Sequence, residues 1–524
     1  MDTKVLRQKV LDLAIRGKLV PQDPNDEPAS VLLERIRQQK QQMVKDGKLK
    51  AKDIKNDTII FVSEDNLHYE KFADGSVKCI EDEIPLDLPE GWAWERLSNL
   101  AAFSGGKTPS TSRREYWDGE VLWVTSKDMK SKYITSSQLR LSALGAEQMQ
   151  VYQPDTLLLV TRSGILRHTL PIAILKECAT VNQDLKAIVL YMPELAEYIY
   201  VCLKGMETQL LLKYTKSGTT VENVNFDEFR KVLLPIAPLH EVGKIIAATN
   251  DATQIVSAIE DDKVALAEYV ARAKAKILDL AIRGQLVPQD PNDEPASVLL
   301  ERIRAEKEEL IRQGKIKRDK KESVIFRGED NSYYEKMGGK VVNIDDEIPF
   351  ELPESWAWCR GYSCFEGLGS TKPQGDFFDY IDIDAIDNRL HCIKDAKHLP
   401  VSDAPSRASR AVKDGSVLFS LVRPYLENIA LVEEKHSNCI ASTGFYVCNS
   451  NGVLLPEFMF FLMISGYVVN GLNQYMKGDN SPSISKDNIE NWLYPVPPIG
   501  EQQTICAKLK TVFTLVENVE KSLN

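Results

Sequence analysis

A block of 27 residues occurs twice in this chain of 524 residues. Residues 11–37 read LDLAIRGKLVPQDPNDEPASVLLERIR, and residues 278–304 read LDLAIRGQLVPQDPNDEPASVLLERIR, so the copies differ only at Lys18 and Gln285. The offset of 267 residues is far longer than the unit of a solenoid, and it indicates a two-fold duplication. A chain of this length is also too long for one core, so we expect several structural units.

Weaker matches extend the repeat in both directions. PEGWAW at 89–94 is repeated as PESWAW at 353–358, and PIAPLHE at 235–241 matches PVPPIGE at 495–501 in part. Between these matches, residues 95–234 and 359–494 show little resemblance to each other. The sequence therefore predicts two nearly identical frames that bracket two divergent inserts.

The frames are helical in pattern. Apolar residues keep helical spacing over 6–15, Gly17 is placed to end that helix, and a second helix resumes over 29–37. Three prolines between 21 and 28 exclude a regular element there. The Gln/Lys-rich run that follows, to about Lys55, has the composition of a solvated helix or linker.

Apolar residues seven apart follow each proline-rich exit, as at Ile505, Val512 and Val519. The same spacing runs from Ile245 to Ala273 in the middle of the chain. These positions predict helices that pair with other helices, although a single amphipathic helix on a globular core would give a similar pattern. A central helix over 241–283 would be roughly 60 Å long, more than the roughly 34 Å of one turn of B-DNA, and we interpret it as a spacer.

The order of these elements has a cyclic symmetry. In the middle of the chain a heptad helix runs into the repeated block, whereas the block opens the chain and a heptad helix closes it. If the two ends meet, they rebuild a second copy of the central frame. The predicted fold is α+β (mixed α/β), with two globular inserts separated by two long antiparallel helical, coiled-coil-like spacers and a pseudo-two-fold cyclic symmetry.

Both inserts mix short β-rich runs with helical stretches. We expect strands over 121–125, 156–161, 187–191, 380–383 and 416–422, and helices over 194–204 and 455–465. Loops of similar character occur at matched places in the two inserts: GGKTPS at 105–110 with GSTKP at 369–373, TRSG at 161–164 with LVRPY at 421–425, and SGTT at 217–220 with GDNSPS at 478–483.

No catalytic constellation stands out in either insert. GKT at 106–108 lacks the leading glycine of a P-loop, and Pro109 stands where a helix should continue. Asp155, Asp184 and Lys186 fit the loose carboxylate-and-lysine pattern of nucleases, but that pattern is common by chance. The histidines lack metal-ligand spacing, so no metal site is predicted.

Gly/Ser/Thr-rich loops that carry Lys and Arg suit the binding of nucleic acid. Their N–H groups, hydroxyls and cations can contact phosphates, while Arg and Asn read base edges in the major groove. Because the net charge is −11, such contacts must come from local faces rather than from bulk charge. The candidate DNA-binding residues are Lys107, Thr108, Arg113, Arg114, Lys127, Lys130, Arg162, Arg167 and Lys216 in the first insert, and Thr371, Lys372, Arg389, Arg407, Arg410, Arg423, Lys477 and Ser483 in the second.

Composition excludes secreted and membrane proteins. The most apolar stretch, 453–469, is broken by Pro456, Glu457 and Gly466, so no membrane span is expected. The charged N-terminus lacks the apolar segment of a secretory signal. Nine scattered cysteines fit reduced thiols, and we expect a cytoplasmic location.

The duplicated block, GGKTP with EYWDG at 115–119, and the two proline-rich exits resemble the DNA-specificity subunit of type I restriction-modification systems. The resemblance covers nearly the whole chain. HEV at 240–242 departs from the Glu-Gln pairing at the first exit, and the second insert lacks the aromatic Tyr-Trp-x-Gly run. The second departure suggests that the two inserts read different sequences.

The resemblance implies that each insert is a target recognition domain that contacts one half of a split double-stranded DNA target. The frames would set the length of the unspecified gap between the two half-sites. They would also dock two modification (methyltransferase) subunits, which carry S-adenosylmethionine and methylate adenine N6. Restriction (translocase-nuclease) subunits, which use ATP and Mg²⁺, would join this core. The chain itself would hold no cofactor or metal and would perform no chemistry.

The implied regions follow the repeat. They are 1–91, a helical region with a linker; 92–238, the first target recognition domain; 239–355, a central helical region with a linker; 356–498, the second target recognition domain; and 499–524, a helix that pairs with the N-terminal region.

The modification subunits would dock on exposed apolar residues of the short helices, for which the candidates are Leu32, Leu33, Leu299 and Leu300. The alternative is that these leucines contact the chain's own heptad helices. Two other functions stay open: a recognition subunit of a related phage-defence or combined restriction-methylation system, and a stand-alone nuclease that uses the carboxylate-and-lysine pattern named above.

Overall fold

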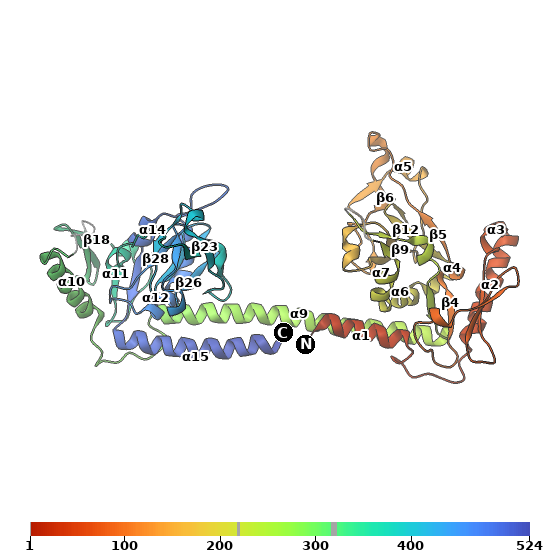
Figure 1. The fold of residues 1–524 in the computed structure, drawn as a ribbon, viewed down its shortest axis with the longest axis horizontal. Coiled ribbons are helices and arrows are strands. Elements are labelled where there is room, and N and C mark those ends of the chain that lie inside the picture. The colour runs from red at the N-terminus through yellow and green to blue at the C-terminus, as the bar shows by residue number, and fades with distance from the viewer. Residues whose placement is uncertain (1, 217–220, 316–321, 524) are drawn as a thin grey trace. The chain divides into compact units, whose positions relative to one another are not determined.

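The computed structural model describes residues 2–216, 221–315 and 322–523. By its internal contacts the chain divides into two compact units, of which the first ends at Asp262 and the second begins at Lys263. Each unit contains one copy of the repeated block, and each mixes helices with sheets, as the sequence predicts (Figure 1). Within the described ranges, no helix has both the length and the apolar character needed to cross a membrane.

The repeated block of the first unit folds as expected. Its helices are α1 (Thr3–Ile15) and α2 (Ala29–Lys45), and residues 18–28 between them form no regular element. Gly17 follows the first helix with a φ of 62°, a left-handed conformation that favours glycine. A side chain at this position would also lie 2.5 Å from Cγ of Pro89. Both constraints explain why glycine stands there.

A small sheet after α2 was not predicted from the sequence. The short helix α3 (Ala51–Ile54) leads into β1 (Ile59–Val62), β2 (His68–Lys71) and β3 (Val77–Cys79), which pair antiparallel in that order. The sequence indicated only a solvated helix or linker up to about residue 55. Strands of three or four residues are too short to show a clear alternation, so they escape a pattern-based prediction.

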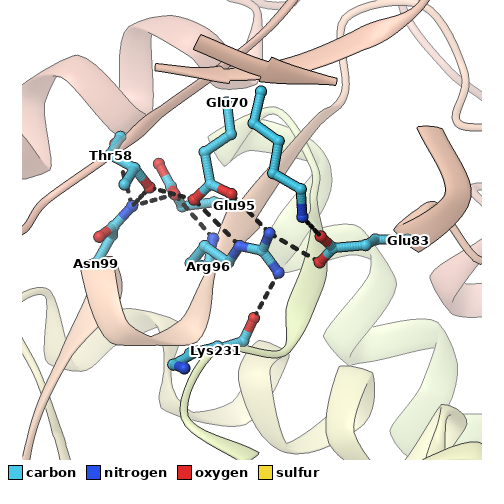
Figure 2. A network of polar contacts seen from close by, with 8 residues as sticks. Thr58, Glu70, Glu83, Glu95, Arg96, Asn99 and Lys231 are labelled. Carbon is cyan, nitrogen blue, oxygen red and sulfur yellow. Dashed lines mark hydrogen bonds and ion pairs between the residues drawn. The ribbon is translucent and has the colours of Figure 1, made fainter. Parts of the chain in front are cut away.

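Charged residues fix this sheet on β4 (Ala93–Arg96), as Figure 2 shows. Arg96 donates to the two carboxylate oxygens of Glu70 at 3.2 and 2.6 Å and pairs with Glu83 at 2.9 Å. Arg96 also donates to the backbone carbonyl of Lys231 at 2.9 Å. Although burial favours its protonated form, hydrogen bonds from Arg96 and Thr58 hold the pKa of Glu70 below its ordinary value. The network therefore joins three separate segments of the first unit.

The strand at the start of the first insert, β4, pairs antiparallel with the strand at its end, β15 (Leu233–Ile236). Just outside this ladder, Nε1 of Trp92 donates to Oε2 of Glu241 at 3.0 Å, and both side chains are buried. Burial raises the pKa of Glu241, which the hydrogen bond from Trp92 partly offsets. This contact ties the start of the insert to the helix that follows it.

Between these strands the first insert contains two larger sheets. One has the strand order β5-β12-β9-β10-β7, and the other has the order β11-β6-β8. The strands are β5 (Ala101–Gly105), β6 (Trp117–Val124), β7 (Tyr133–Ile134), β8 (Leu139–Leu141), β9 (Leu157–Val160), β10 (Ile172–Leu175), β11 (Ala179–Val181) and β12 (Leu185–Leu190). The remaining elements are α4 (Leu97–Leu100), α5 (Ala143–Glu147), α6 (Ala196–Gly205), α7 (Glu207–Tyr214), α8 (Phe226–Phe229) and the hairpin of β13 (Thr215–Lys216) with β14 (Asn223–Val224). The predicted strands and helix of this insert are confirmed within a few residues.

The long central helix is confirmed as α9 (Leu239–Ile282), with 44 residues. In the first unit, Arg7 on α1 donates to Ser257 and Glu260 of α9 at 3.3 and 3.0 Å. In the second unit, Lys274 of α9 pairs with Glu520 of α15 (Ile499–Leu523) at 3.0 Å. Each half of α9 thus has a polar contact with a different helix.

The heptad seam of α9 is only partly buried. Ile245, Val256 and Val270 are buried, whereas Leu266 remains 37 % exposed. The seam is thus buried at some of its positions and open at others.

The second unit repeats the frame of the first. α10 (Ala296–Arg312) corresponds to α2, and β16 (Ser323–Arg327), β17 (Tyr333–Met337) and β18 (Lys340–Asn343) form its three-stranded sheet. Arg360 pairs with Glu335 and Glu347, each at 2.8 Å. Nε1 of Trp356 donates to Glu501 at 2.8 Å, which reproduces the tryptophan–glutamate contact of the first unit.

The second insert lies between β19 (Ala357–Arg360) and β29 (Leu493–Val496), which pair antiparallel. Its sheets have the orders β23-β20-β27-β24, β26-β25-β28 and β21-β22. Their strands are β20 (Phe377–Ile381), β21 (Ile386–Asp387), β22 (Cys392–Ile393), β23 (Lys397–Pro400), β24 (Ala408–Ala411), β25 (Val417–Ser420), β26 (Ile429–Leu431), β27 (Ile440–Ser442) and β28 (Phe445–Cys448). The helices are α11 (Gly361–Cys364), α12 (Pro456–Met463), α13 (Gly466–Asn473) and α14 (Lys486–Asn491). The predicted strands and helix of this insert are again confirmed within a few residues.

The leucines expected to be exposed on the short helices are not exposed. Leu32 and Leu33 are 1 % and 4 % exposed and belong to the core of the first unit. Leu299 is 2 % exposed in the core of the second unit, and Leu300 packs against that core. The prediction of an exposed docking surface at these four residues is wrong, because the apolar side of each short helix packs on its own unit.

Candidate nucleic-acid interface

One end of the five-stranded sheet collects the candidate loops of the first insert. β5 and β9 end there and β12 begins there, because Gly105 pairs with Lys186 and Val160 pairs with Leu185. We call this edge the loop end of the first insert. It brings residues that are far apart in the sequence next to one another.

The GGKTPS loop is anchored at this loop end by its backbone. A side chain on Gly106 would lie 2.0 Å from the carbonyl oxygen of Val181, so only glycine permits this approach. The N–H of Lys107 donates to that carbonyl at 3.2 Å, and Thr108 donates through its hydroxyl to Gln183 at 2.6 Å. The side chains of Lys107 and Thr108 are exposed. The loop thus holds its backbone firmly while presenting an amine and a hydroxyl.

The TRSG loop and the β13–β14 hairpin meet at the same end. Val224 donates its N–H to the carbonyl of Thr161 at 2.9 Å, and Arg162 forms a β-bridge with Asn223. Asn223 also pairs with Lys216 across the hairpin. Arg162 and Lys216 are exposed. The predicted SGTT loop at 217–220 lies outside the described residues.

The second insert repeats this arrangement. Ile484 donates its N–H to the carbonyl of Leu421 at 2.9 Å, and Val422 forms a β-bridge with Ser483. Ser483 also bridges Lys477, which occupies the place that the lysine of β13 has in the first insert. The matched loops that the sequence indicated are therefore matched in space within each unit.

The register of these bridges shows that the two candidate arginines are not equivalent. Arg423 corresponds to Ser163, one residue beyond Arg162. Arg423 has a φ of 48°, donates its N–H to the carbonyl of Pro482 at 2.7 Å, and donates from its guanidinium to the carbonyl of Asn480 at 3.0 Å. Arg423 is thus fixed against the loop at 478–483, whereas Arg162 extends from a strand-like bridge.

Further candidates of the first insert lie beside this end. Arg167 pairs with the buried Glu222 at 2.5 Å. Lys127 and Lys130 are exposed in the turn after β6, whose last residue accepts a backbone hydrogen bond from Asn182 at 3.0 Å. These three cations therefore neighbour the loop end.

Arg113 and Arg114 lie farther along the first loop and are exposed. Arg113 donates to the hydroxyl of Tyr116 at 2.8 Å and lies over its ring. Trp117 donates through its indole to the carbonyl of Ser110 at 3.2 Å, which fixes this outer part of the loop. The two arginines are not brought into contact with the other candidates.

The second insert has a corresponding loop end, where β20, β25 and β27 end and β24 and β28 begin. Arg407 stands there at the start of β24, exposed, with its guanidinium 3.7 Å from Asp382. Arg389 is exposed on the turn of the β21–β22 hairpin, next to Asn388, which donates to the carbonyl of Leu426 at 2.7 Å. That contact holds the hairpin beside the turn that contains Arg423.

The remaining candidates of the second insert lie along β24. Thr371 donates its N–H to Ser409 at 3.0 Å, and Lys372 beside it is exposed. Arg410 is half-buried within the strand, and its Nε is buried without a hydrogen-bond partner among the described residues. Arg410 is therefore less accessible than the other arginines of this insert.

The carboxylate-and-lysine pattern does not assemble into one site. Asp155 precedes β9 and pairs with Lys176 at 3.0 Å, whereas Asp184 lies beyond the opposite end of that strand, beside Lys186 at the start of β12. The two carboxylates are thus separated by the length of β9. Among the described residues, no three His, Cys, Asp or Glu side chains are placed to hold a metal ion.

Three amides at the loop ends were missed by the sequence analysis. Gln183, Asn223 and Asn480 are exposed next to the candidate cations. Amide side chains can pair with adenine in the major groove. Asn480 lies inside the GDNSPS loop at 478–483, so the sequence could have indicated this amide as a candidate.

Comparisons with known proteins relate this chain to DNA-specificity subunits. Residues 89–263 match the family model described as the type I restriction modification DNA specificity domain. The chain is 25 % identical to the type I restriction enzyme EcoAI specificity subunit of Escherichia coli, over 97 % of this chain and 88 % of that one. The chain is thus similar to type I DNA-specificity subunits along nearly its whole length.

Two further comparisons give the extent of the likeness. The chain is 25 % identical to the EcoEI specificity subunit of Escherichia coli, over 99 % of this chain and 90 % of that one. It also aligns with the solved HsdS subunit from Thermoanaerobacter tengcongensis at 36 % identity and a TM-score of 0.32. That alignment covers 33 % of this chain and less than half, 46 %, of the solved chain.

Proposed function

We propose that this specificity subunit recognises a split double-stranded DNA sequence and directs partner subunits to it. The observation that carries the proposal is the repeated loop end. In each insert the loop after a buried strand is bridged to a hairpin that carries an exposed lysine, Lys216 or Lys477. One such surface per insert suits one half-site per insert.

The side chains at the loop ends have the chemistry that DNA recognition needs. Lysines contact phosphates as point charges, whereas an arginine such as Arg162 can pair in a bidentate way with guanine. Amides such as Asn223 and Asn480 can pair with adenine. Because the residues at equivalent positions differ between the inserts, we expect two different half-sites.

The frames would determine where the two half-sites stand. We propose that α9 acts as the spacer and that α1 and α15 complete an antiparallel, coiled-coil-like frame with pseudo-two-fold cyclic symmetry. The five regions bounded at residues 91, 238, 355 and 498 belong to this proposal. The support is the duplicated sequence, which places one frame before each insert.

Chemistry would come from the partners. Subunits of this family work in complexes with other subunits and with DNA, and we propose two modification subunits with S-adenosylmethionine, joined by restriction subunits that use ATP and Mg²⁺. The present chain would be non-catalytic, would carry no cofactor or metal, and would act in the cytoplasm. These expectations rest on the family resemblance.

Exchange of one insert tests the modular proposal. We would replace residues 95–234 with the corresponding insert of another specificity subunit and map N6-methyladenine in cells that also express the modification subunit. The prediction is that one half of the methylated sequence changes while the other half and the gap stay the same. A change in both halves would contradict the assignment of one half-site to each insert.

A further inference from the structure

Each unit presents a second exposed surface, on its three-stranded sheet. In the first unit Glu70 points to Arg96, so its neighbours on the sheet face outward by alternation. This outer face carries Phe61, Tyr69, Lys71 and Val77. Phe61 and Tyr69 lie opposite each other and stack with ring centroids 6.0 Å apart.

The second unit carries the same outer face. Phe326, Tyr334, Lys336 and Val341 occupy the corresponding positions, and the two rings stack at 5.9 Å. Both phenylalanines are about 40 % exposed, and both valines are 52 % exposed. All four residue types are therefore the same in the two copies, although nothing in the described chain covers them fully. Large exposed apolar groups that recur in this way indicate a binding surface.

The surroundings of both outer faces are acidic. Residues 57–83 contain eight Asp and Glu against two Lys and Arg, and residues 322–347 contain seven against three. Two carboxylates in each range pair with Arg96 or Arg360 outside it, which leaves six against two and five against three. The hydroxyl of Tyr69 donates to Asp65 at 2.8 Å, and that of Tyr334 donates to Asp330 at 2.8 Å. Each pair of rings thus lies directly beside a carboxylate.

This combination favours a protein partner over DNA. A negative surface repels phosphates, so the outer faces differ in kind from the loop ends. Stacked aromatic rings next to carboxylates attract a guanidinium or ammonium group through cation–π and ionic contacts. The exposed phenylalanine and valine would pack against apolar side chains of the same segment.

We propose that the two outer faces are twin docking sites for a basic, apolar segment of a protein subunit that is present twice in the complex. The inference rests on the proposed function, which supplies two copies of a partner. Identical surfaces bind identical ligands, so each unit would hold one copy. Lys or Arg of the segment would lie over the aromatic pair and against Asp65 or Asp330.

Photo-cross-linking tests the occupant directly. A photo-reactive benzoylphenylalanine would replace Val77 or Val341 in the complex co-expressed with its modification and restriction subunits. We expect both positions to cross-link to the same Lys- or Arg-containing segment of one partner subunit. Leu139, 48 % exposed on the first insert, gives the matched control position. Cross-links from Val77 and Val341 to DNA alone, or none in an assembled complex, would overturn the proposal.

Substitutions test the energetics of the same site. Phe61→Ser and Phe326→Ser should each weaken the binding of one of the two partner copies on the order of tenfold, and the double variant should weaken both. Phe61→Leu keeps an apolar side chain but removes the ring, so it should show an intermediate loss. Asp65→Asn should lower the affinity and its dependence on salt. Unchanged affinity in the double variant would contradict the inference.

One readout separates this inference from the proposed function. If the wild-type complex methylates no split sequence, the proposed function fails. If the wild-type complex does methylate a split sequence, and the double variant binds its partners as the wild type does, only the docking inference fails. Supporting variants should keep the methylated sequence unchanged, because the loop ends are untouched.

Discussion

At the scale of single residues, Glu95 marks a difference between the two units. It lies on β4 opposite Leu234, is 2 % exposed, and accepts a hydrogen bond from Asn99 at 2.6 Å. In the second unit Cys359 stands at the corresponding place, opposite Tyr494. At this position the first unit therefore has a buried carboxyl group, whereas the second unit has a thiol.

Glu95 should make the stability of the first unit depend on pH. Burial raises its pKa to about 7, above the unfolded value of about 4.3. Its contribution to stability is therefore fully present below about pH 4 and is lost as the pH rises through about 7. Glu95→Gln should raise the free energy of unfolding at pH 8 by up to about 3 kcal/mol, with little effect near pH 4. Denaturant titrations of both proteins at several pH values measure this difference, and identical pH profiles would refute it.

Arg162 and Arg423 should each affect only one half of the target. Arg162→Ala should weaken binding to specific DNA by about 1–3 kcal/mol if its guanidinium pairs with a base. Arg423 has a left-handed backbone, so Arg423→Gly removes its side chain without adding strain. Binding assays on duplexes altered in one half-site would show which half each arginine reads.

Two lysines provide the matched controls for these arginines. Lys216→Gln and Lys477→Gln should weaken specific and random DNA alike and reduce the salt slope by about one. If the arginine variants behaved in the same way, the arginines would be assigned to phosphates instead of bases.

At the scale of elements, the role of α9 depends on its length. Residues 261–267 lie in the middle of α9, and Val264 and Leu266 there are exposed. Deletion of these seven residues removes about 10.5 Å of helix. The side chains beyond the deletion keep nearly the same direction around the helix axis, because seven residues make almost two turns. The methylated sequence should then have a gap shorter by about three base pairs, or methylation should be lost. An altered half-site would contradict the spacer role.

Long or strongly patterned elements could be predicted from the sequence, and short ones could not. The heptad spacing gave α9 to within two residues at its start, and the duplicated block gave α1 and the beginning of α2. The strands β1 to β3 escaped, because three or four residues cannot show a period. At the site, the matched loops predicted which segments meet. The burial of Leu32 and Leu299 was missed, since an amphipathic pattern does not reveal which surface covers it.

At the scale of the whole molecule, the two units follow one internal plan. Each closes its insert with a short ladder, ties that ladder to a helix through Trp92 with Glu241 or Trp356 with Glu501, and docks a small sheet through one arginine. Only the inserts differ between these shared contacts. A repeated frame with divergent inserts is the organisation expected when recognition must change while assembly stays the same.

The most direct test of this account is the methylome of cells that express the chain with its neighbouring modification subunit. Long-read sequencing would map every N6-methyladenine. Recognition of one half-site by each insert predicts a single split sequence, with two different short half-sites around a gap of fixed length. Methylation of one continuous sequence, or no methylation by a complex shown to be assembled, would contradict it.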